Sequence, residues 1–568
     1  MVDLETAVVQ RFRSRLPVID LVTEYRREYV TDDLLAGVTL WAVLVPQALA
    51  YASLAGVPPV VGLYTALGSM AMYVVFGTSR QLNVGPEGTV AILVATIASP
   101  LAGGDVGQYL AFTSALAVFV GFFSILGGLL KLGWITRFLS RPVLIGYILG
   151  SAVIIATSQL GSLLGIDAPS LVATLRALDE LNPWTLTVGT LTVLVVLVAR
   201  RFGPRVPAYL IGMTVATVVV TVGDLTTRGV AIVGDIRPGL PAIGFPDLAV
   251  ADFSSLLGPA LAVALLMYVD SLLTERSLAK RNDYEVDANQ EFFGLGAANV
   301  GSGLLGGFPV NGSQSRSTVN DAARAKTQVA NLVALLLVVL TLLFLTPLFR
   351  DLPRAALAGV LLVAATELVD VAALRRVWVI NKFDFRLALF TAVLVVVVGV
   401  LAGILAAVVL SLFDAAVKPY QPHTAELARV PGTDRFRDVD SVPDVEPIPG
   451  LIIYRFDARL YFANAEVFAD EVIELVESAD PPAREVMLSA GAIIDIDSTA
   501  HETLHELIED LHERGIRFTV ARAKPTFLET LDRSGLLEEI DACYLEVDTG
   551  VSAFQRRNER DGSPDREG

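Results

Sequence analysis

Cysteine and histidine are scarce in this sequence of 568 residues. The single cysteine, Cys543, excludes a disulfide scaffold and a cysteine-rich zinc site. All four histidines lie beyond residue 417, at His423, His501, His505 and His512. The first 417 residues therefore lack the side chain best suited to acid–base chemistry near neutral pH. Because GxSxG, HExxH and Walker motifs are also missing, we expect no enzyme.

Charge is scarce too, and it is unevenly placed. Charged residues make up 18% of the chain, against about 25% in soluble domains. Residues 418–568 hold 32 acidic and 16 basic side chains, whereas the first 417 hold 28 and 27. Neither part has the basic surface that phosphate neutralisation requires, so no nucleic-acid partner is expected. The sequence thus predicts a nearly neutral apolar block followed by an acidic soluble region.

Apolar runs fill the first block, and about 20 such residues suffice to cross a bilayer as a helix. Clear examples are Tyr109–Leu130, Thr185–Ala199, Ala251–Asp270 and Val329–Leu345. Division at charged or Gly/Pro-rich breaks gives about fourteen spans, several of them short. The first 30 residues hold five arginines and no apolar core, so no cleavable signal peptide is expected.

Lysine and arginine in the connections indicate the orientation, because they favour the cytoplasmic side. With the N-terminus inside, the inner connections hold 16 of these residues and the outer ones five. We therefore expect a multi-pass protein of the cell membrane, embedded in the lipid bilayer, with its N-terminus and acidic region in the cytoplasm.

Two segments do not fit full spans. Gln81–Gly85 and Phe308–Gly312 are extended in pattern, and each precedes a short helix-compatible run. Extended backbone is tolerated in a membrane only inside protein or beside a cavity. Each segment thus predicts a strand followed by a half-helix, as in transporters with inverted repeats. Two helix N-termini facing one cavity would bind an anion. The alternative is that both segments are kinks or loops.

At these residues the sequence resembles the SulP (sulfate permease) family of anion transporters. The motifs lie in Asp33–Tyr64, Gly77–Pro86 and Asn289–Ser317, and the region from Leu451 to Asp548 is similar to the STAS domain of this family. The resemblance implies an α-helical membrane protein with seven-plus-seven inverted repeats, a core bundle of spans 1–4 and 8–11, a gate bundle of spans 5–7 and 12–14, and a small cytoplasmic α/β STAS domain. It also implies a homodimer.

These motifs and the composition divide the chain into five expected parts. They are a cytoplasmic N-terminal segment (1–31), a transport domain (32–417), a linker (418–450), the STAS domain (451–548) and a disordered tail (549–568). The resemblance implies that the anion lies between the third and tenth spans and is lined by the first and eighth. Carried onto this chain, the substrate-binding residues are Gln47, Tyr51, Glu87, Gly88, Thr89, Ser313, Ser315 and Arg316.

Several of these residues have a second interpretation. Gln47 could donate to an oxyanion or satisfy a neighbouring helix, and Tyr51 could line the cavity or anchor at the interface. Arg316 would attract the anion, because a buried charge in a membrane is costly and functional by default. It could also form an ion pair with Glu87 or Asp270. Glu87 could carry a coupling proton or simply cap its helix.

Asp270 and Thr274 share a helical face in the eighth span. The pattern is similar to that of sodium-coupled bicarbonate members, where it supplies oxygen ligands to the cation. The alternative is a wetted carboxylate at the cytoplasmic end of the span. Ser498 is expected to cap a helix in the STAS domain, and in related proteins a serine at this turn is a phosphorylation site. His501 and His505 have metal-ligand spacing but no third ligand.

The sequence therefore predicts secondary transport of small anions by an elevator-like movement of the core against the gate. Sodium-coupled bicarbonate uptake is the first choice, and proton-coupled dicarboxylate or sulfate uptake and anion exchange are alternatives. No cofactor is expected beyond a coupling Na⁺ or H⁺. A membrane-anchored STAS signalling module is the alternative of another class, and no partner for the STAS domain is indicated.

Overall fold

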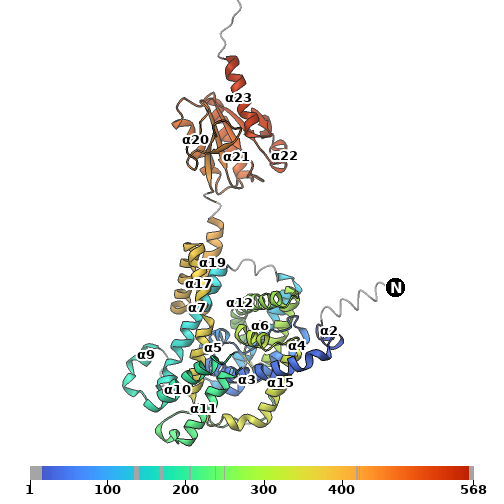
Figure 1. Cartoon of the computed structure of the whole chain (residues 1–568), viewed down its shortest axis with the longest axis vertical. Helices are drawn as coiled ribbons and strands as arrows, with labels where there is room; N and C mark the ends of the chain where they lie inside the picture. Colours follow the sequence, from blue (N-terminus) through green and yellow to red (C-terminus); the bar gives the residue numbers. More distant parts are fainter. Residues whose placement is uncertain are drawn as a thin grey trace, which may run out of the picture. The chain divides into compact units, whose positions relative to one another are not determined.

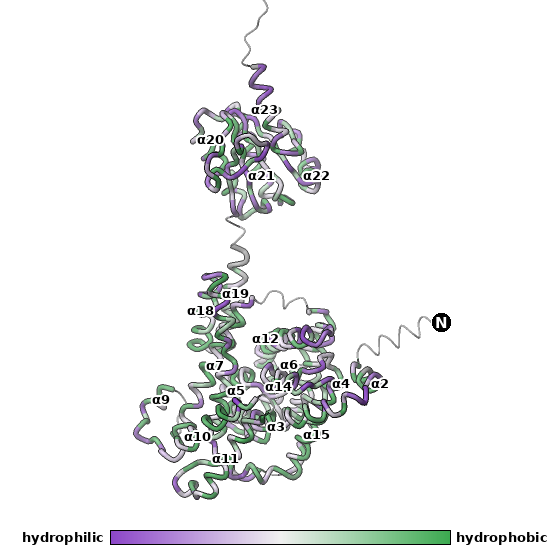
Figure 2. Tube along the Cα trace, in the orientation of Figure 1, coloured by the Kyte–Doolittle hydropathy of each residue, from purple (hydrophilic) through white to green (hydrophobic). Residues whose placement is uncertain are grey.

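Long apolar helices dominate the first part of the chain. The computed structural model describes residues 16–133, 140–166, 171–203, 206–236, 238–247, 250–417, 420 and 422–561. They belong to two units, divided between Ser411 and Leu412. Among the described residues of the first unit, eight helices have 18 or more residues and are apolar enough to span a membrane. Figure 2 shows hydrophobic residues along these helices.

The first half of the membrane unit contributes seven span helices. They are α3 (Val30–Leu54), α4 (Pro59–Phe76), α5 (Gly88–Ala102), α6 (Val106–Leu129), α7 (Arg141–Ser158), α10 (Pro183–Arg200) and α11 (Ala208–Val222). Shorter elements precede or connect them, namely α2 (Val18–Thr23), η1 (Arg27–Tyr29), α8 (Leu160–Leu164), α9 (Leu171–Arg176), η3 (Leu178–Glu180) and η4 (Leu225–Arg228).

The second half of the unit also contributes seven span helices among the described residues. Its helices are α12 (Val250–Arg281), α13 (Ala288–Leu304), α14 (Gln314–Ala322), α15 (Val329–Leu340), α16 (Arg354–Leu368), α18 (Lys382–Val398) and α19 (Val400–Val417). A π-helical turn η5 (Thr341–Leu345) and η6 (Thr346–Phe349) extend α15, and α17 (Val371–Ile380) lies between α16 and α18. The prediction of about fourteen spans is confirmed.

One predicted boundary was wrong. The span expected to end at Asp270 continues as α12 to Arg281, because Leu272 and Leu278 pack in a buried cluster of the core despite the charges beside them. Asp270 therefore lies inside a long helix and not at its end. Asp270 is partly exposed, so its interpretation as a wetted carboxylate stays open beside that of a cation ligand.

The helices pack as two bundles (Figure 1). In the core bundle, α13 packs against α4 and α6, and α15 packs against α3 and α4. In the gate bundle, α10 contacts α11 and α16, and α7 contacts α16 and α18. Val143 of α7, Leu387 of α18 and Ala407 of α19 form a small buried cluster that adds α19 to the gate. Contacts of α3 with α11 and α16, and of α5 with α7, join the bundles. The core and gate grouping is thus as expected.

Glycines allow several of these helices to touch backbone to backbone. A Cβ atom on Gly68 of α4 would lie 2.3 Å from the carbonyl oxygen of Gly301 in α13, and one on Gly146 of α7 would lie 2.1 Å from that of Ala388 in α18. Helix association in lipid depends on such close contact, because apolar burial gives no driving force there.

The second unit is an α/β domain around a six-stranded sheet with the order β4-β3-β5-β6-β7-β8. Strands β5 to β8 are parallel, and β3 is antiparallel to both β4 and β5. The strands are β3 (Thr424–Arg429), β4 (Phe436–Asp438), β5 (Leu451–Phe456), β6 (Glu485–Ser489), β7 (Arg517–Ala521) and β8 (Ala542–Tyr544). The helices are α20 (Ala465–Ser478), α21 (Ser498–Glu513), α22 (Pro525–Ser534), η8 (Leu536–Glu538) and α23 (Val547–Asp561).

Two expectations for this region need correction. Strands β3 and β4 lie within the predicted linker 418–450, because β3 pairs with the edge of β5 and buries Ala425 and Leu427. Helix α23 extends to Asp561, within the predicted tail 549–568, because Val551 and Phe554 pack in the same cluster. Residues 562–568 lie outside the described part.

The serine turn also differs from expectation, and His505 has a carboxylate partner that the sequence did not predict. Asp497, not Ser498, caps α21, since its carboxylate accepts from the Ala500 amide at 2.9 Å and leaves Ser498 exposed. His505 Nδ1 lies 2.6 Å from Glu539 Oε2, and this pair is ionic when the histidine is protonated. No group of three potential metal ligands occurs in the described residues.

We expect Gly68→Ala to destabilise the membrane unit by about 1–3 kcal/mol, because the new methyl group overpacks the contact with Gly301. The thermal unfolding of the detergent-purified protein measures this loss. Gly258→Ala on α12 is the control, since no atom lies within 4 Å of a Cβ there. An unchanged unfolding temperature for Gly68→Ala would contradict this packing.

The hydrogen bond that His505 donates to Glu539 raises the pKa of His505 above its ordinary value. The stabilisation is therefore fully present below the unfolded-state pKa of about 6.5 and is lost as the pH rises through the folded-state value. We expect the STAS unit to lose stability between pH 6 and pH 8, and His505→Gln to reduce that loss. Urea unfolding at both pH values tests this, and an equal loss in the variant would refute it.

Candidate anion-binding site

Two strand-and-half-helix units meet inside the core bundle. Strand β1 (Val84–Gly85) pairs antiparallel with β2 (Asn311–Gly312), so that Val84 lies opposite Gly312. Helix α5 begins three residues after β1, and α14 begins two residues after β2. Every residue from Gln81 to Val90 is buried, as extended backbone in a membrane requires. The two interrupted segments are therefore half-helix units and not loops.

The N-terminus of α5 is already occupied by a carboxylate. Glu87, 7% exposed, accepts from the amides of Thr89 at 2.9 Å and Val90 at 3.3 Å, and from the Thr89 hydroxyl. These bonds satisfy the free amides of the first turn and place a negative charge at the positive end of the helix. The contacts are those of the capping interpretation, and a proton-carrying role for Glu87 stays a prediction.

The N-terminus of α14 is different, because its cap is neutral. The Ser313 hydroxyl accepts from the Arg316 amide at 3.4 Å, a long bond. The amides of Gln314 and Ser315 have no partner among the described residues. Half-helix α14 therefore offers the uncompensated positive helix end of the pair.

Arg316 lies at the centre of the site and is fully buried. Its Nε donates to Asn83 Oδ1 at 2.5 Å, and its Nη1 donates to the Pro86 carbonyl at 2.7 Å and to Gln47 Oε1 at 3.3 Å. All three acceptors are neutral. Within the described chain no carboxylate lies within 4 Å of the guanidinium, and Glu87 acts on it only at longer range. The ion pair with Glu87 or Asp270, which was the alternative interpretation of Arg316, is therefore not formed.

Two donors in this cluster have no partner among the residues that the structure describes. Arg316 Nη2 and Gln47 Nε2 are both buried and unpaired, and Gln47 touches Arg316 through its amide oxygen. A buried donor without a partner is costly, more so when it is charged. Gly85 leaves room beside Arg316 Nη2, since a Cβ there would lie 3.3 Å from that nitrogen. An anion with several oxygens could pair with both donors.

The first span contributes an aromatic wall. Tyr51 of α3 is 7% exposed, and its Cε1 atom would lie 3.1 Å from a Cβ placed on Gly88, at the start of α5. The charged groups within electrostatic range of its hydroxyl are those of Glu87, Arg316 and Glu367. The structure thus gathers the predicted residues Gln47, Tyr51, Glu87, Gly88, Thr89, Ser313 and Arg316 around the two half-helix starts.

Ser315, the remaining predicted residue, points toward the gate bundle. Its hydroxyl donates at 2.9 Å to Glu367 of α16, which also accepts from the Tyr209 hydroxyl at 2.5 Å and pairs with Arg200 at 2.9 Å. This cluster joins α14 of the core to α10, α11 and α16 of the gate. Sequence reasoning missed Glu367, although it is the only carboxylate within Arg354–Leu368. It also missed Asn83, a buried polar residue directly before strand β1.

Asp270 and Thr274 lie beside β2. Asn311 Nδ2 donates to Asp270 Oδ2 at 2.7 Å, and Ser271 Oγ is 2.5 Å from Asn311 Oδ1. The Thr274 hydroxyl donates to the Asp270 carbonyl at 3.3 Å. The contacts place an oxygen-rich face of α12 against the strand pair. Cation binding by Asp270 and Thr274 stays a prediction.

Two helical bundles, with two half-helices that start from paired strands and a buried arginine beside them, form the architecture of a secondary membrane transporter. The Sulfate permease family model matches residues 30–391, and the STAS domain model matches residues 442–550. The chain therefore belongs to the sulfate permease family of anion transporters.

Relatives with full-length similarity carry sulfate in their names. A probable sulfate transporter of Mycobacterium tuberculosis is 38% identical over 542 residues, which cover 94% of this chain and 97% of that protein. "Sulfate transporter 4.1, chloroplastic" of Arabidopsis thaliana is 32% identical over 564 residues, which cover 94% and 82%.

Solved structures share the fold. The structure of SLC26A9 has a TM-score of 0.86 at 22% identity, covering 98% of this chain and 95% of that one. The transmembrane domain of the cyanobacterium bicarbonate transporter BicA has a TM-score of 0.61 at 25% identity, covering 68% and 98%.

The bond between Ser315 and Glu367 predicts energetic coupling between core and gate. In a double-mutant cycle of Ser315→Ala and Glu367→Gln, we expect a coupling energy of about 0.6 kcal/mol, the usual size for such bonds in membranes. Thermal unfolding of the four proteins gives this value. Strict additivity of the two substitutions would show that the contact contributes nothing. Ser315→Ala combined with Glu180→Gln, a pair without contact, is the control.

Proposed function

We propose that this protein carries small oxyanions across the membrane by alternating access, with sulfate as the first candidate. The observation that carries this proposal is Arg316, a fully buried cation with neutral partners and an unpaired nitrogen beside the unpaired amide of Gln47. A membrane protein retains such a charge at high cost, so a transient anionic partner is its natural counterpart. The full-length relatives named as sulfate transporters favour sulfate over other oxyanions.

Sodium-coupled bicarbonate uptake is the second candidate. The oxygen face of Asp270 and Thr274 supports it, and so does the fold similarity to the BicA domain. Carboxylate, hydroxyl and carbonyl oxygens are the ligands that hard cations take. Sulfate carries two negative charges, whereas bicarbonate carries one. The transport site holds one buried cation, Arg316, and the carboxylates of Glu87 and Glu367 lie nearby. The site therefore balances the single charge of bicarbonate better than the two charges of sulfate. Sulfate would depend more than bicarbonate on a cation that is transported with it.

The movement we propose is an elevator-like displacement of the core against the gate. Tyr51 lies on core helix α3, Glu87 caps core helix α5 and Arg316 lies on core helix α14, so the anion would travel with the core. The Ser315–Glu367 bond and the packing of α3 against α11 and α16 join the two bundles and must rearrange in each cycle. We also propose that the protein works as a homodimer in the cell membrane, with the STAS domain on the cytoplasmic side.

Uptake of labelled sulfate into proteoliposomes tests the function. We expect Arg316→Lys to lower sulfate uptake at least about tenfold, because lysine keeps the charge but loses the planar fork that binds Asn83, Pro86 and Gln47. Arg375→Lys on the exposed surface of α17 is the control. Full uptake by the Arg316→Lys protein would remove Arg316 from the transport site. Uptake of bicarbonate but not sulfate by the unchanged protein would favour the second candidate.

The coupling ion is distinguished by gradients and two variants. If sodium drives transport, an inward Na⁺ gradient should stimulate uptake, and Asp270→Ala should abolish that stimulation. If protons drive it, an inward H⁺ gradient should do so, and Glu87→Gln should remove the dependence. Stimulation by neither gradient, with uptake driven by anions preloaded inside, would identify an exchanger.

A further inference from the structure

A cavity lies in the core bundle, away from Arg316. It has a volume of about 690 Å³ and opens between the segment that leads into α3, the end of α4 and the α14–α15 connection. Its wall includes Tyr25, Thr78, Ser79 and Gln328. This end of the bundle carries the N-terminal segment and is therefore the end expected to face the cytoplasm.

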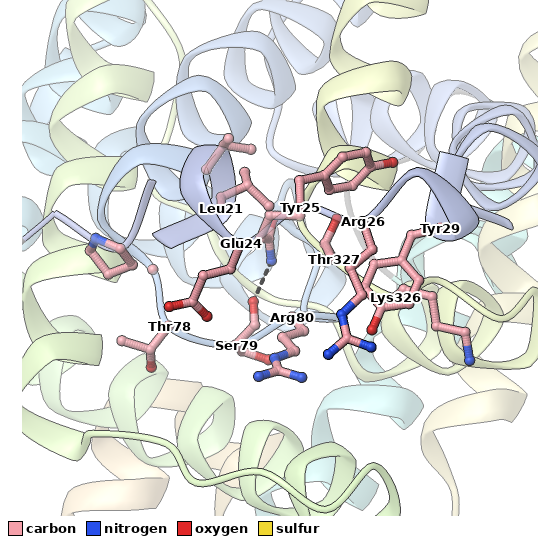
Figure 3. Close-up of a pocket in the computed structure, with 14 residues that line it drawn as sticks. Leu21, Glu24, Tyr25, Arg26, Tyr29, Thr78, Ser79, Arg80, Lys326 and Thr327 are labelled. Atoms are coloured by element: carbon pink, nitrogen blue, oxygen red, sulfur yellow. Dashed lines mark hydrogen bonds between the residues drawn. The ribbon is translucent and has the colours of Figure 1, made fainter. Parts of the chain in front are cut away.

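Three cations from three separate segments line this cavity: Arg26 before η1, Arg80 between α4 and β1, and Lys326 between α14 and α15. Figure 3 shows their charged ends pointing to the same open side. Arg26 pairs with Glu28 at 3.3 Å, but both side chains are about two-thirds exposed, so the pair is screened and weak. Glu24 is the one carboxylate in the wall, which leaves an excess of positive charge.

The inner wall adds a buried polar group. Gln328 is 6% exposed, and its Nε2 donates to the Ser79 carbonyl at 2.5 Å and to the Leu82 carbonyl at 3.1 Å. Its Oε1 is buried and has no partner among the described residues. An unpaired buried acceptor at the wall of a basic cavity suits a ligand with both an anionic group and a hydroxyl group.

We propose that this cavity binds a hydroxyl-bearing phosphate ester, either the headgroup of an anionic lipid or a soluble phosphate compound. Arginine forks match phosphate oxygens, and lysine adds a point charge. Cations at the cytoplasmic membrane surface attract anionic lipids, so the position suits a headgroup as well as a soluble ligand. The proposal does not depend on which anion is transported.

Occupancy of the cavity acts on the segment that fixes the transport site. The amides of Thr78 and Ser79 donate to Glu291 of α13 at 2.6 and 3.1 Å. Gln328 holds Ser79 and Leu82, and the next residue, Asn83, accepts from Arg316. A bound phosphate would therefore restrain the extended segment from Thr78 to Asn83, and with it the acceptor of Arg316. We expect the ligand to change the KM for the transported anion.

Binding to the full-length protein tests the proposal. The purified protein is titrated with dihexanoyl phosphatidylglycerol for the lipid arm and with glycerol 3-phosphate for the soluble arm, and thermal stabilisation is followed. We expect saturable binding of at least one of them. The triple variant Arg26→Gln, Arg80→Gln and Lys326→Gln should bind at least about tenfold more weakly. Binding of the first probe alone identifies a headgroup, and binding of the second identifies a soluble ligand.

The matched control is Arg375→Gln, Arg376→Gln and Lys382→Gln, which removes the same charge from α17 and the start of α18, outside the cavity. This variant should bind as the unchanged protein does. An equal loss in both triple variants would reduce the effect to net charge and overturn the proposal. Saturable binding of neither probe by the unchanged protein would overturn it as well. Gln328→Leu, which keeps all three cations, should weaken binding of the hydroxyl-bearing probes but not of inorganic phosphate.

Discussion

The membrane unit depends on the burial of one guanidinium group. Arg316 is held by Asn83 from the approach to β1, by the Pro86 carbonyl before α5 and by Gln47 of α3, so a single side chain fastens three elements of the core. Because each acceptor is neutral, the charge is oriented but not cancelled. The strand pair of β1 and β2 supports this arrangement by satisfying the extended backbone that carries two of those acceptors.

The two half-helices look alike in sequence but differ in their electrostatics. Helix α5 carries its own carboxylate, since Glu87 caps its first turn, whereas α14 is capped by a neutral serine and holds Arg316 in its first turn. The positive potential is therefore concentrated on the α14 side of the strand pair. Asp270, Ser271 and Asn311 surround the other end of β2 with oxygen atoms. One strand pair thus separates a cationic environment from an oxygen-rich one.

The bundles, the half-helix units and most of the site could be predicted because their signals are local. Proline after a short extended run predicts a broken helix, and a charge in an apolar span indicates a site. Partnership across the chain could not be predicted. Nothing near Ser315 shows that it donates to Glu367, 52 positions away, and nothing near Arg316 shows that its acceptors are neutral. The strand β3 was missed for the same reason, because its pattern gains meaning only beside β5.

The hydroxyl of Ser315 can donate one hydrogen bond, and Glu367 accepts it. If a bound anion accepts that hydrogen bond instead, Glu367 loses this contact with the core. It keeps its contacts with Tyr209 and Arg200, which both belong to the gate bundle. Binding of the anion and loss of the contact between core and gate would then occur in the same step. The bond would then resist movement of the core before an anion binds and would no longer resist it afterwards. The hydroxyl of Ser315 alone would thereby link anion binding to the release of the core from the gate.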